Sequence, residues 1–485
     1  MNGRDLVRSM GRGDAERGLR GRLRWGRAGA SDGSGRGAER ARTPGPLVGV
    51  EPGPGGGVLR FARAGLEVRV REGGVVSLGW DGAGPLPSSA LAGPPPEPDP
   101  RVLLEPDRDG GRRLVSERMT VTVSRLGAVE VRTPGGELLR RELPPRWWDA
   151  ADDGVPPRWT QRAELPPDAR FLGLGAPGPR LRDGTYGLRN APAGSAPDAG
   201  EGSAVPAAPV QWVVADAGTH LSFHDCASDG RVTLREGEEG AGSGHDRPAV
   251  SELRMDGGPL RCWVIVGAPA RIAQTWATLT GGTGSRHSGG AVVDPPAYGW
   301  GALREAAADA VRTRLHPYVA ALSDRGRHTG APLLRPLWWD APEDRALRDC
   351  EDAFLLGDAL LVAPLPTPDA DRRTVRLPPG RWYDTATEEV FDGPGPVTVD
   401  APLSRTPVLA RAGSAIPVLG AGGEPEVEVW LPTPGQVARA SQPGFFAYEL
   451  TVDGTVRVLD GDGGPTTLPV HVRGRGESPT GRCTT

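Results

Sequence analysis

Apolar and polar residues alternate with a period of two along much of the chain between Gly53 and about Val266. Leu66–Val70, Met119–Val123 and Val129–Val131 are clear examples, with Pro-Gly-Gly or Asp-Gly turns nearby. Alternation of this kind buries one face of a strand and leaves the other in water, as an antiparallel sandwich requires. The pattern therefore predicts a β-sandwich-like structure for the N-terminal part of the chain.

Two segments have helical periodicity instead. A continuous apolar strand, Arg261–Val266, leads to Pro269, which suits the first turn of a helix, and apolar residues then recur at helical spacing up to Leu279. A second helix has one apolar stripe and ends near Gly330, which suits the position after a helix. Pro317 is expected to kink this helix. The stripe consists of Leu303, Ala307, Val311, Leu315, Tyr318 and Leu322.

Strands are predicted again from Pro332 to about Val472, including a hairpin around Asp453-Gly454. Gly- and Ser-rich residues 281–301 indicate a linker. Residues 1–42 hold eleven arginines against five acids. An RNA-binding arm is one reading of this segment, but aromatic residues are nearly absent from it, so a disordered leader is favoured.

Composition excludes several classes of function. The net charge is -4 and none of the 57 basic residues is a lysine, so neither nucleic acid nor a membrane is an expected partner and lysine-based catalysis is excluded. The four cysteines are far apart and form no CxxC pair, which argues against disulfides and zinc sites and fits a reducing cytosol. No apolar run could span a membrane and no secretory signal is visible, so we expect a cytoplasmic protein.

The sequence offers only weak candidates for metal-binding or catalytic residues. His220 and His224 have the spacing of a helical metal pair but lie in a predicted strand without a third ligand, so ordinary packing is favoured. Asp460–Gly463 resembles part of a calcium loop and is interpreted as a turn. An acidic cluster is interpreted as a solvated face. It comprises Asp340, Asp344, Asp349, Glu351 and Asp352. We therefore predict no catalytic, cofactor-binding or metal-binding residues, and no cofactor.

Four blocks between Leu333 and Leu419 resemble glycoside hydrolase family 31, the α-glucosidase family, at the end of its catalytic barrel and in the sandwich that follows. They occur in the family's order with similar gaps, and they are Arg335–Trp339, Phe354–Pro364, Leu377–Asp384 and Pro407–Ser414. Weaker ordered resemblances lie upstream, at Phe171–Gly175, Phe223–Asp225 and Trp263–Gly281, and the segment Arg314–Tyr318 resembles the family's last barrel helix.

The resemblance implies a retaining α-glycosidase with a (β/α)8 barrel, but this chain has no room for one. The barrel would lie between Gly281 and Leu315, which are 34 residues apart, whereas eight strand–helix units need about 250 residues. The family's catalytic carboxylates lie in asparagine-containing motifs, and asparagine occurs here only at positions 2 and 190. Trp147–Asp149 and Trp338–Asp340 resemble the nucleophile motif superficially and are interpreted as structural.

The expected fold is mainly β with a few helices: an N-terminal β-sandwich-like domain, a remnant of a (β/α)8 barrel, and C-terminal β-sandwich domains. The predicted boundaries are a leader at 1–45, the N-terminal domain at 46–267, the barrel remnant at 268–332, a proximal sandwich at 333–422, a distal β segment at 423–475 and a tail at 476–485.

Three hypotheses follow for function. The first is an α-glycosidase acting on α-glucosides or oligosaccharides, with its activity lost because the barrel is missing. The second is a carbohydrate-binding or scaffold protein, in which exposed Trp147, Trp148, Trp159 and Trp382 would stack on sugars. The third, favoured for the chain as it stands, is a non-functional deletion product whose apolar helix stripe would be exposed or drive self-association.

Overall fold

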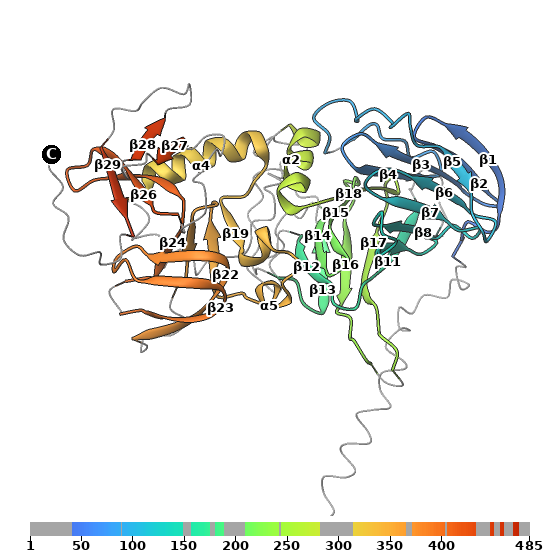
Figure 1. Cartoon of the computed structure of the whole chain (residues 1–485). Coiled ribbons are helices and arrows are strands. Elements are labelled where there is room, and N and C mark those ends of the chain that lie inside the picture. Colours follow the sequence, from blue (N-terminus) through green and yellow to red (C-terminus); the bar gives the residue numbers. More distant parts are fainter. Residues whose placement is uncertain are drawn as a thin grey trace, which may run out of the picture. The chain divides into compact units, whose positions relative to one another are not determined.

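A computed structural model gives the structure of the chain (Figure 1). It describes residues 41–88, 90–148, 157–174, 180–188, 209–241, 244–281, 314–364, 371–402, 405–432, 447–450, 456–459 and 469–474. The residues from Arg42 onward cluster as one compact unit, and the description below concerns that unit.

Two large antiparallel sheets form the N-terminal part. The first has the strand order β1-β2-β3-β4-β18-β15-β14-β12. Its strands are β1 (Leu47–Gly53), β2 (Gly56–Phe61), β3 (Gly65–Arg71), β4 (Val75–Trp80), β12 (Arg170–Gly173), β14 (Val210–Ala215), β15 (Gly218–His224) and β18 (Arg261–Val266).

The second sheet has the order β13-β16-β17-β11-β9-β8-β7-β6-β5, with β10 paired to β11. Its strands are β5 (Leu104–Pro106), β6 (Arg112–Val115), β7 (Thr120–Val123), β8 (Val129–Arg132), β9 (Leu138–Glu142), β10 (Arg146–Trp148), β11 (Arg158–Leu165), β13 (Gly184–Leu188), β16 (Gly230–Arg235) and β17 (Ala249–Met255).

The two sheets enclose one apolar core. Val68 from β3, Val121 from β7, Val131 from β8 and Trp159 from β11 are all buried in this core. Strands β3, β7 and β8 bury alternate residues, as the sequence pattern predicts. The predicted N-terminal sandwich is therefore present.

Strand β18 is buried on both faces. Cys262, Val264 and Val266 point into the core of the sandwich, and Trp263 and Ile265 point into a second apolar cluster on the opposite face. A strand covered on both sides needs a continuous apolar run, which is why Arg261–Val266 does not alternate.

Helix α2 (Pro269–Thr280) covers that second face, and helix α4 (His316–Thr329) packs against α2 and against β25 (Ala415–Leu419) of the C-terminal part (Figure 1). Helix α2 begins with a proline in its first turn and is capped by Gly281 in the left-handed conformation. Helix α4 is capped in the same way by Gly330. Pro317 lies in the first turn of α4, where it removes no helical hydrogen bond, so it causes no kink within the described helix.

The C-terminal part is also mainly β. A six-stranded sheet has the order β19-β20-β21-β24-β22-β23. A three-stranded sheet has β26 between β25 and β29, and β27 pairs with β28. The strands are β19 (Leu334–Pro336), β20 (Phe354–Leu356), β21 (Leu360–Val362), β22 (Arg372–Asp384), β23 (Val390–Asp400), β24 (Val408–Arg411), β25 (Ala415–Leu419), β26 (Pro425–Trp430), β27 (Ala447–Leu450), β28 (Val456–Leu459) and β29 (Val470–Arg473). A 3-10 turn, η1 (Leu337–Asp340), and a short helix, α5 (Arg345–Arg348), precede β20.

The predicted fold class is confirmed: the chain is mainly β with a few helices, and the described residues form no closed barrel. The predicted hairpin strands pair as β27 and β28, although the turn at Asp453-Gly454 lies outside the described residues. So do residues 1–40 of the leader, the linker at 282–301, the stripe residues Leu303 to Val311, and the Asp460–Gly463 segment. Residues 41–45 of the predicted leader are described, and Arg42 forms a β-bridge with Trp147. The domain boundaries stay predictions.

Candidate functional site

The predicted acidic cluster lies at the surface, as its interpretation as a solvated face predicts, because three of its acids are exposed and two are half-buried. Most of its members are also paired with arginines. Asp340 pairs with Arg411, and Asp352 pairs with Arg373. Asp344 caps helix α5 by accepting hydrogen bonds from the Ala346 and Leu347 amides at 2.9 and 3.1 Å. The remaining two acids, Asp349 and Glu351, contact arginines of the N-terminal part.

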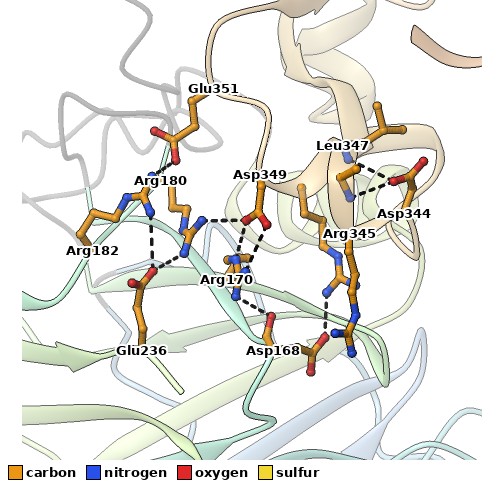
Figure 2. Close-up of polar contacts among 12 residues, drawn as sticks. Asp168, Arg170, Arg180, Arg182, Glu236, Asp344, Arg345, Leu347, Asp349 and Glu351 are labelled. Atoms are coloured by element: carbon orange, nitrogen blue, oxygen red, sulfur yellow. Dashed lines mark hydrogen bonds and ion pairs between the residues drawn. The ribbon is translucent and has the colours of Figure 1, made fainter. Parts of the chain in front are cut away.

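These contacts belong to a group of charged residues that we call the seam cluster (Figure 2). It joins α5 and the residues after it to loops and strand ends of the N-terminal sandwich. Its members are Asp168, Arg170, Arg180, Arg182, Asp216, Glu236, Glu239, Arg345, Arg348, Asp349 and Glu351.

Asp349 receives two arginines. The Arg170 Nε atom lies 2.7 Å from its carboxylate, and the Arg180 Nη1 atom lies 2.8 Å from it. Arg180 also pairs with Glu236, and Arg182 pairs with Glu351. The Arg180 side chain is 8% exposed, so this side of the seam is held by a largely covered guanidinium with a carboxylate from each part of the chain.

Helix α5 supplies the other side of the seam. Its two arginines, Arg345 and Arg348, are three residues apart. The Arg345 Nε atom lies 2.8 Å from the Asp216 carboxylate, and the Arg345 Nη1 atom lies 2.7 Å from the Glu239 carboxylate. Arg348 donates to Asp168 at 2.9 Å and also pairs with Asp216. The Asp168 carboxylate accepts the Asp216 amide hydrogen at 2.7 Å as well.

A cavity of about 220 Å³ lies within the seam cluster. Three arginines and three acids line it, together with Pro167 and Gly237. The charged lining residues are Asp168, Arg170, Glu239, Arg345, Arg348 and Asp349. This lining contains no aromatic side chain, and the cavity is smaller than the roughly 300–1,000 Å³ of typical small-molecule sites.

The charges of the seam favour ionised carboxylates. A hydrogen bond from Arg345, followed by those of Arg348, lowers the pKa of Asp216 to about 2 although partial burial opposes the shift. Arg345 likewise lowers the pKa of the Glu239 carboxyl group. Burial would raise the pKa of Asp349, but Arg170 and Arg180 bring it below its usual value.

The seam cluster is therefore unsuited to glycosidase chemistry. A general acid must hold a proton near neutral pH, which requires a raised pKa. Every seam carboxyl group with a shifted pKa is shifted downward instead, and each is bound to arginine. The arrangement can hold two parts of the chain together, and we treat it as a docking contact.

The tryptophans that could stack on sugars are mostly inside the protein. Trp147, Trp159 and Trp382 are buried, and Trp148 is half-buried. Trp147 packs edge-on against Trp80, and Arg411 lies over the ring of Trp382 at 4.9 Å. Trp338 and Trp339 of the second Trp-Trp-Asp segment are buried as well.

His220 and His224 both lie in β15, as predicted, and both are buried. Burial lowers the pKa of His224 to about 4, so its imidazole is neutral at pH 7. The expectation that no third metal-ligating group would lie near this pair was wrong for His224, because a carboxylate and a thiol approach it from two other strands.

Sequence reasoning missed the N-terminal half of the seam. Asp168, Arg170 and Asp216 are single charged residues at strand ends, and nothing in their local spacing marks them. An available signal was the density of charge on the C-terminal side, at Arg345 to Glu351, because so many charges in a short loop need partners. Asp149 and Asn190 lie outside the described residues.

Comparison with known families identifies the segment around the seam. Residues 330–416 match the glycosyl hydrolase family 31 C-terminal domain. Alpha-glucosidase 2 of Bacillus thermoamyloliquefaciens is 37% identical over 100 residues, which cover 21% of this chain and 13% of that protein. Human neutral alpha-glucosidase C is 37% identical over 114 residues, covering 23% of this chain and 12% of that protein. The matches thus span about an eighth of these relatives' length.

Solved structures resemble a larger share of the chain at low sequence identity. The Flavobacterium johnsoniae GH31 dextranase complexed with glucose aligns with a TM-score of 0.60 at 12% identity, covering 81% of this chain and 84% of that chain. The alpha subunit of glucosidase II, bound to alpha3-Glc2, aligns with a TM-score of 0.64 at 10% identity, covering 83% and 84%. At such identities the likeness concerns the fold alone.

Proposed function

Because this chain is a protein of glycoside hydrolase family 31, related to the α-glucosidases, we propose that it is a non-catalytic member that serves as a β-sandwich scaffold. The observation that carries the proposal is the 34-residue separation of Gly281 and Leu315. Hydrolysis with retention needs two carboxyl groups about 5–5.5 Å apart across the sugar, mounted on a barrel of about 250 residues. That barrel cannot be built from so short a segment.

Packing of the two helices favours a folded scaffold over a non-functional deletion product with an exposed apolar stripe. Leu315, Tyr318 and Leu322 of the predicted stripe are buried in the same apolar cluster as Trp276 of α2. The described part of the stripe is therefore covered within one chain. Self-association through Leu303 to Val311, and a cytoplasmic location, stay predictions. Among the described helices none is long and apolar enough to cross a membrane.

An activity assay on the folded full chain tests the proposal. We expect no release of nitrophenol from p-nitrophenyl α-glucoside above the buffer blank, with a complete family α-glucosidase as the positive control. Release that scales with the protein and elutes with it on gel filtration would contradict the proposal. Asp149→Asn and Asp340→Asn would then show which Trp-Trp-Asp segment supplies a nucleophile.

Carbohydrate binding is the alternative, and the buried tryptophans weaken it. Trp148 remains the partly accessible member of the predicted set. Affinity electrophoresis through a gel containing soluble starch should leave the migration of the chain unchanged. Retardation that Trp148→Ala removes, while Trp339→Phe preserves it, would favour a sugar-binding scaffold.

A further inference from the structure

Three residues with different metal-binding groups meet inside the N-terminal sandwich. A carboxylate oxygen of Glu142, a ring nitrogen of His224 and the thiol of Cys262 all lie within 4.8 Å of one another. The three side chains are buried, with exposed fractions of 4%, 5% and 4%. None of them belongs to the seam cluster, and none of them lines the seam cavity.

Strand pairing explains how these residues come together. His224 and Cys262 are directly opposite each other in the register of β15 and β18, so their side chains lie on the same face of the sheet. Glu142 ends strand β9 of the facing sheet. The group therefore bridges the two sheets of the sandwich, with one ligand from β9 and two from the β15–β18 pair.

Two atoms of this group lack the partners that buried polar atoms normally have. The Glu142 Oε2 and His224 Nε2 atoms find no hydrogen-bond partner within the part of the chain that the structure describes. Leaving a buried polar atom unpaired costs about 1–3 kcal/mol, and more when the group is charged. A cation between Glu142 and His224 would satisfy both atoms.

The surroundings fit a cation that takes one oxygen of Glu142. The other oxygen, Oε1, accepts a hydrogen bond from Arg140 Nε at 2.6 Å, which fixes the orientation of the carboxylate. Outer partners of this kind commonly orient metal ligands. A cavity of about 10 Å³ lies beside the group, lined by Glu142 and Cys262 but not by His224, and has room for about one water molecule.

We propose that Glu142, His224 and Cys262 bind a zinc ion that fastens the two sheets of the N-terminal sandwich together. Sulfur, nitrogen and carboxylate oxygen are the donors that zinc accepts, whereas calcium and magnesium require oxygen ligands. On binding, the Cys262 thiol releases its proton to solvent and the sulfur bonds to zinc as thiolate. With a thiolate, a carboxylate and the Arg140 guanidinium around it, the occupied site has a net charge of +1.

Cobalt substitution tests the site without relying on a variant that must fold. The full chain is refolded from EDTA-treated protein with one equivalent of Co²⁺ per chain. We expect a thiolate-to-cobalt charge-transfer band in the near ultraviolet and visible bands typical of tetrahedral cobalt. Zinc should displace cobalt with a stoichiometry of one, and the midpoint of thermal unfolding should rise with zinc concentration.

Cysteine variants test whether the sulfur that binds the metal belongs to Cys262. A chain with Cys226→Ser, Cys350→Ser and Cys483→Ser, in which Cys262 is the last cysteine, should keep the band. Cys262→Ser should remove it and weaken zinc binding at least tenfold, and Glu142→Gln should weaken zinc binding without removing the band. His220→Gln, on the same strand, is the control that should change neither quantity.

The proposal is overturned if the folded wild-type chain, verified by circular dichroism, gives no charge-transfer band and binds less than about 0.1 equivalent of zinc. It is equally overturned if the chain that keeps Cys262 alone loses the band, because the metal would then bind elsewhere. If Cys262→Ser does not fold, the wild-type chain and the chain with Cys262 alone still decide between these outcomes.

Discussion

At the scale of single residues, Arg348 is a clear example of a side chain that joins distant parts of the sequence. It is 2% exposed and pairs with Asp168 and Asp216 of the N-terminal sandwich. Arg348→Ala should lower the free energy of unfolding by about 2–4 kcal/mol, because the Asp168 side chain, which is 9% exposed, would lose its ion pair. Urea unfolding measures this loss. Arg372→Ala, which breaks an exposed pair with Asp400, should cost under about 1 kcal/mol; equal losses would contradict the assignment.

The lowered pKa of Asp216 predicts how the stability of the chain changes as the pH is lowered. Its pKa is about 2 in the folded chain, below the usual 3.8, chiefly because of hydrogen bonds from Arg345. A lowered folded-state pKa adds stability that is present above the unfolded value and is lost as the pH falls through the folded value. The unfolding midpoint of the wild-type chain should therefore decrease as the pH is lowered from about 4 to about 2. Asp216→Asn should be less stable at pH 7 and show a shallower fall, and a parallel fall would exclude the role of Asp216.

At the scale of elements, local patterns were sufficient to predict several strands and helices. Arg261–Val266 and the helix beginning at Pro269 have the bounds that their apolar runs and proline position indicate. Pairing could not be predicted in the same way. His224 faces Cys262, and α5 faces Asp216, through register and packing between segments that are remote in sequence, and local periodicity contains no information about either contact.

The contact between α2 and α4 depends on a glycine. Gly330 ends α4 with φ at +67°, and a Cβ added there would lie 2.3 Å from the Ala273 carbonyl oxygen of α2. Gly330→Ala should destabilise the chain by both backbone strain, roughly 1–2 kcal/mol, and forced separation of the helices, roughly 1–3 kcal/mol. Gly82→Ala is the matched control, because Gly82 has φ at +78° with no atom within 4 Å of the added Cβ. Thermal unfolding should show a larger loss for Gly330→Ala, and equal losses would exclude the packing contribution.

At the scale of the whole molecule, one apolar cluster extends from the N-terminal sandwich to the C-terminal sheets. Trp212 of β14 and Trp339 of η1 lie in it with ring centroids 5.9 Å apart, and Tyr318 of α4 adds a hydrogen bond to the Leu356 carbonyl at 2.9 Å. The sequence indicated which residues are apolar but gave no sign that the two β-rich parts share a core, since the family resemblance implies a barrel between them.

A shared core predicts cooperative unfolding. Unfolding of either part would expose the tryptophans that cover the other, so intermediate states with one part folded should be scarcely populated. Urea curves followed by tryptophan fluorescence and by far-ultraviolet circular dichroism should coincide, and the calorimetric and van't Hoff enthalpies should agree. Trp339→Ala should lower the stability by about 3–5 kcal/mol and shift both curves together, because the cavity would lie where the parts meet. Two resolved transitions in the wild-type chain, or a shift of one curve alone in Trp339→Ala, would mean that the two parts fold independently.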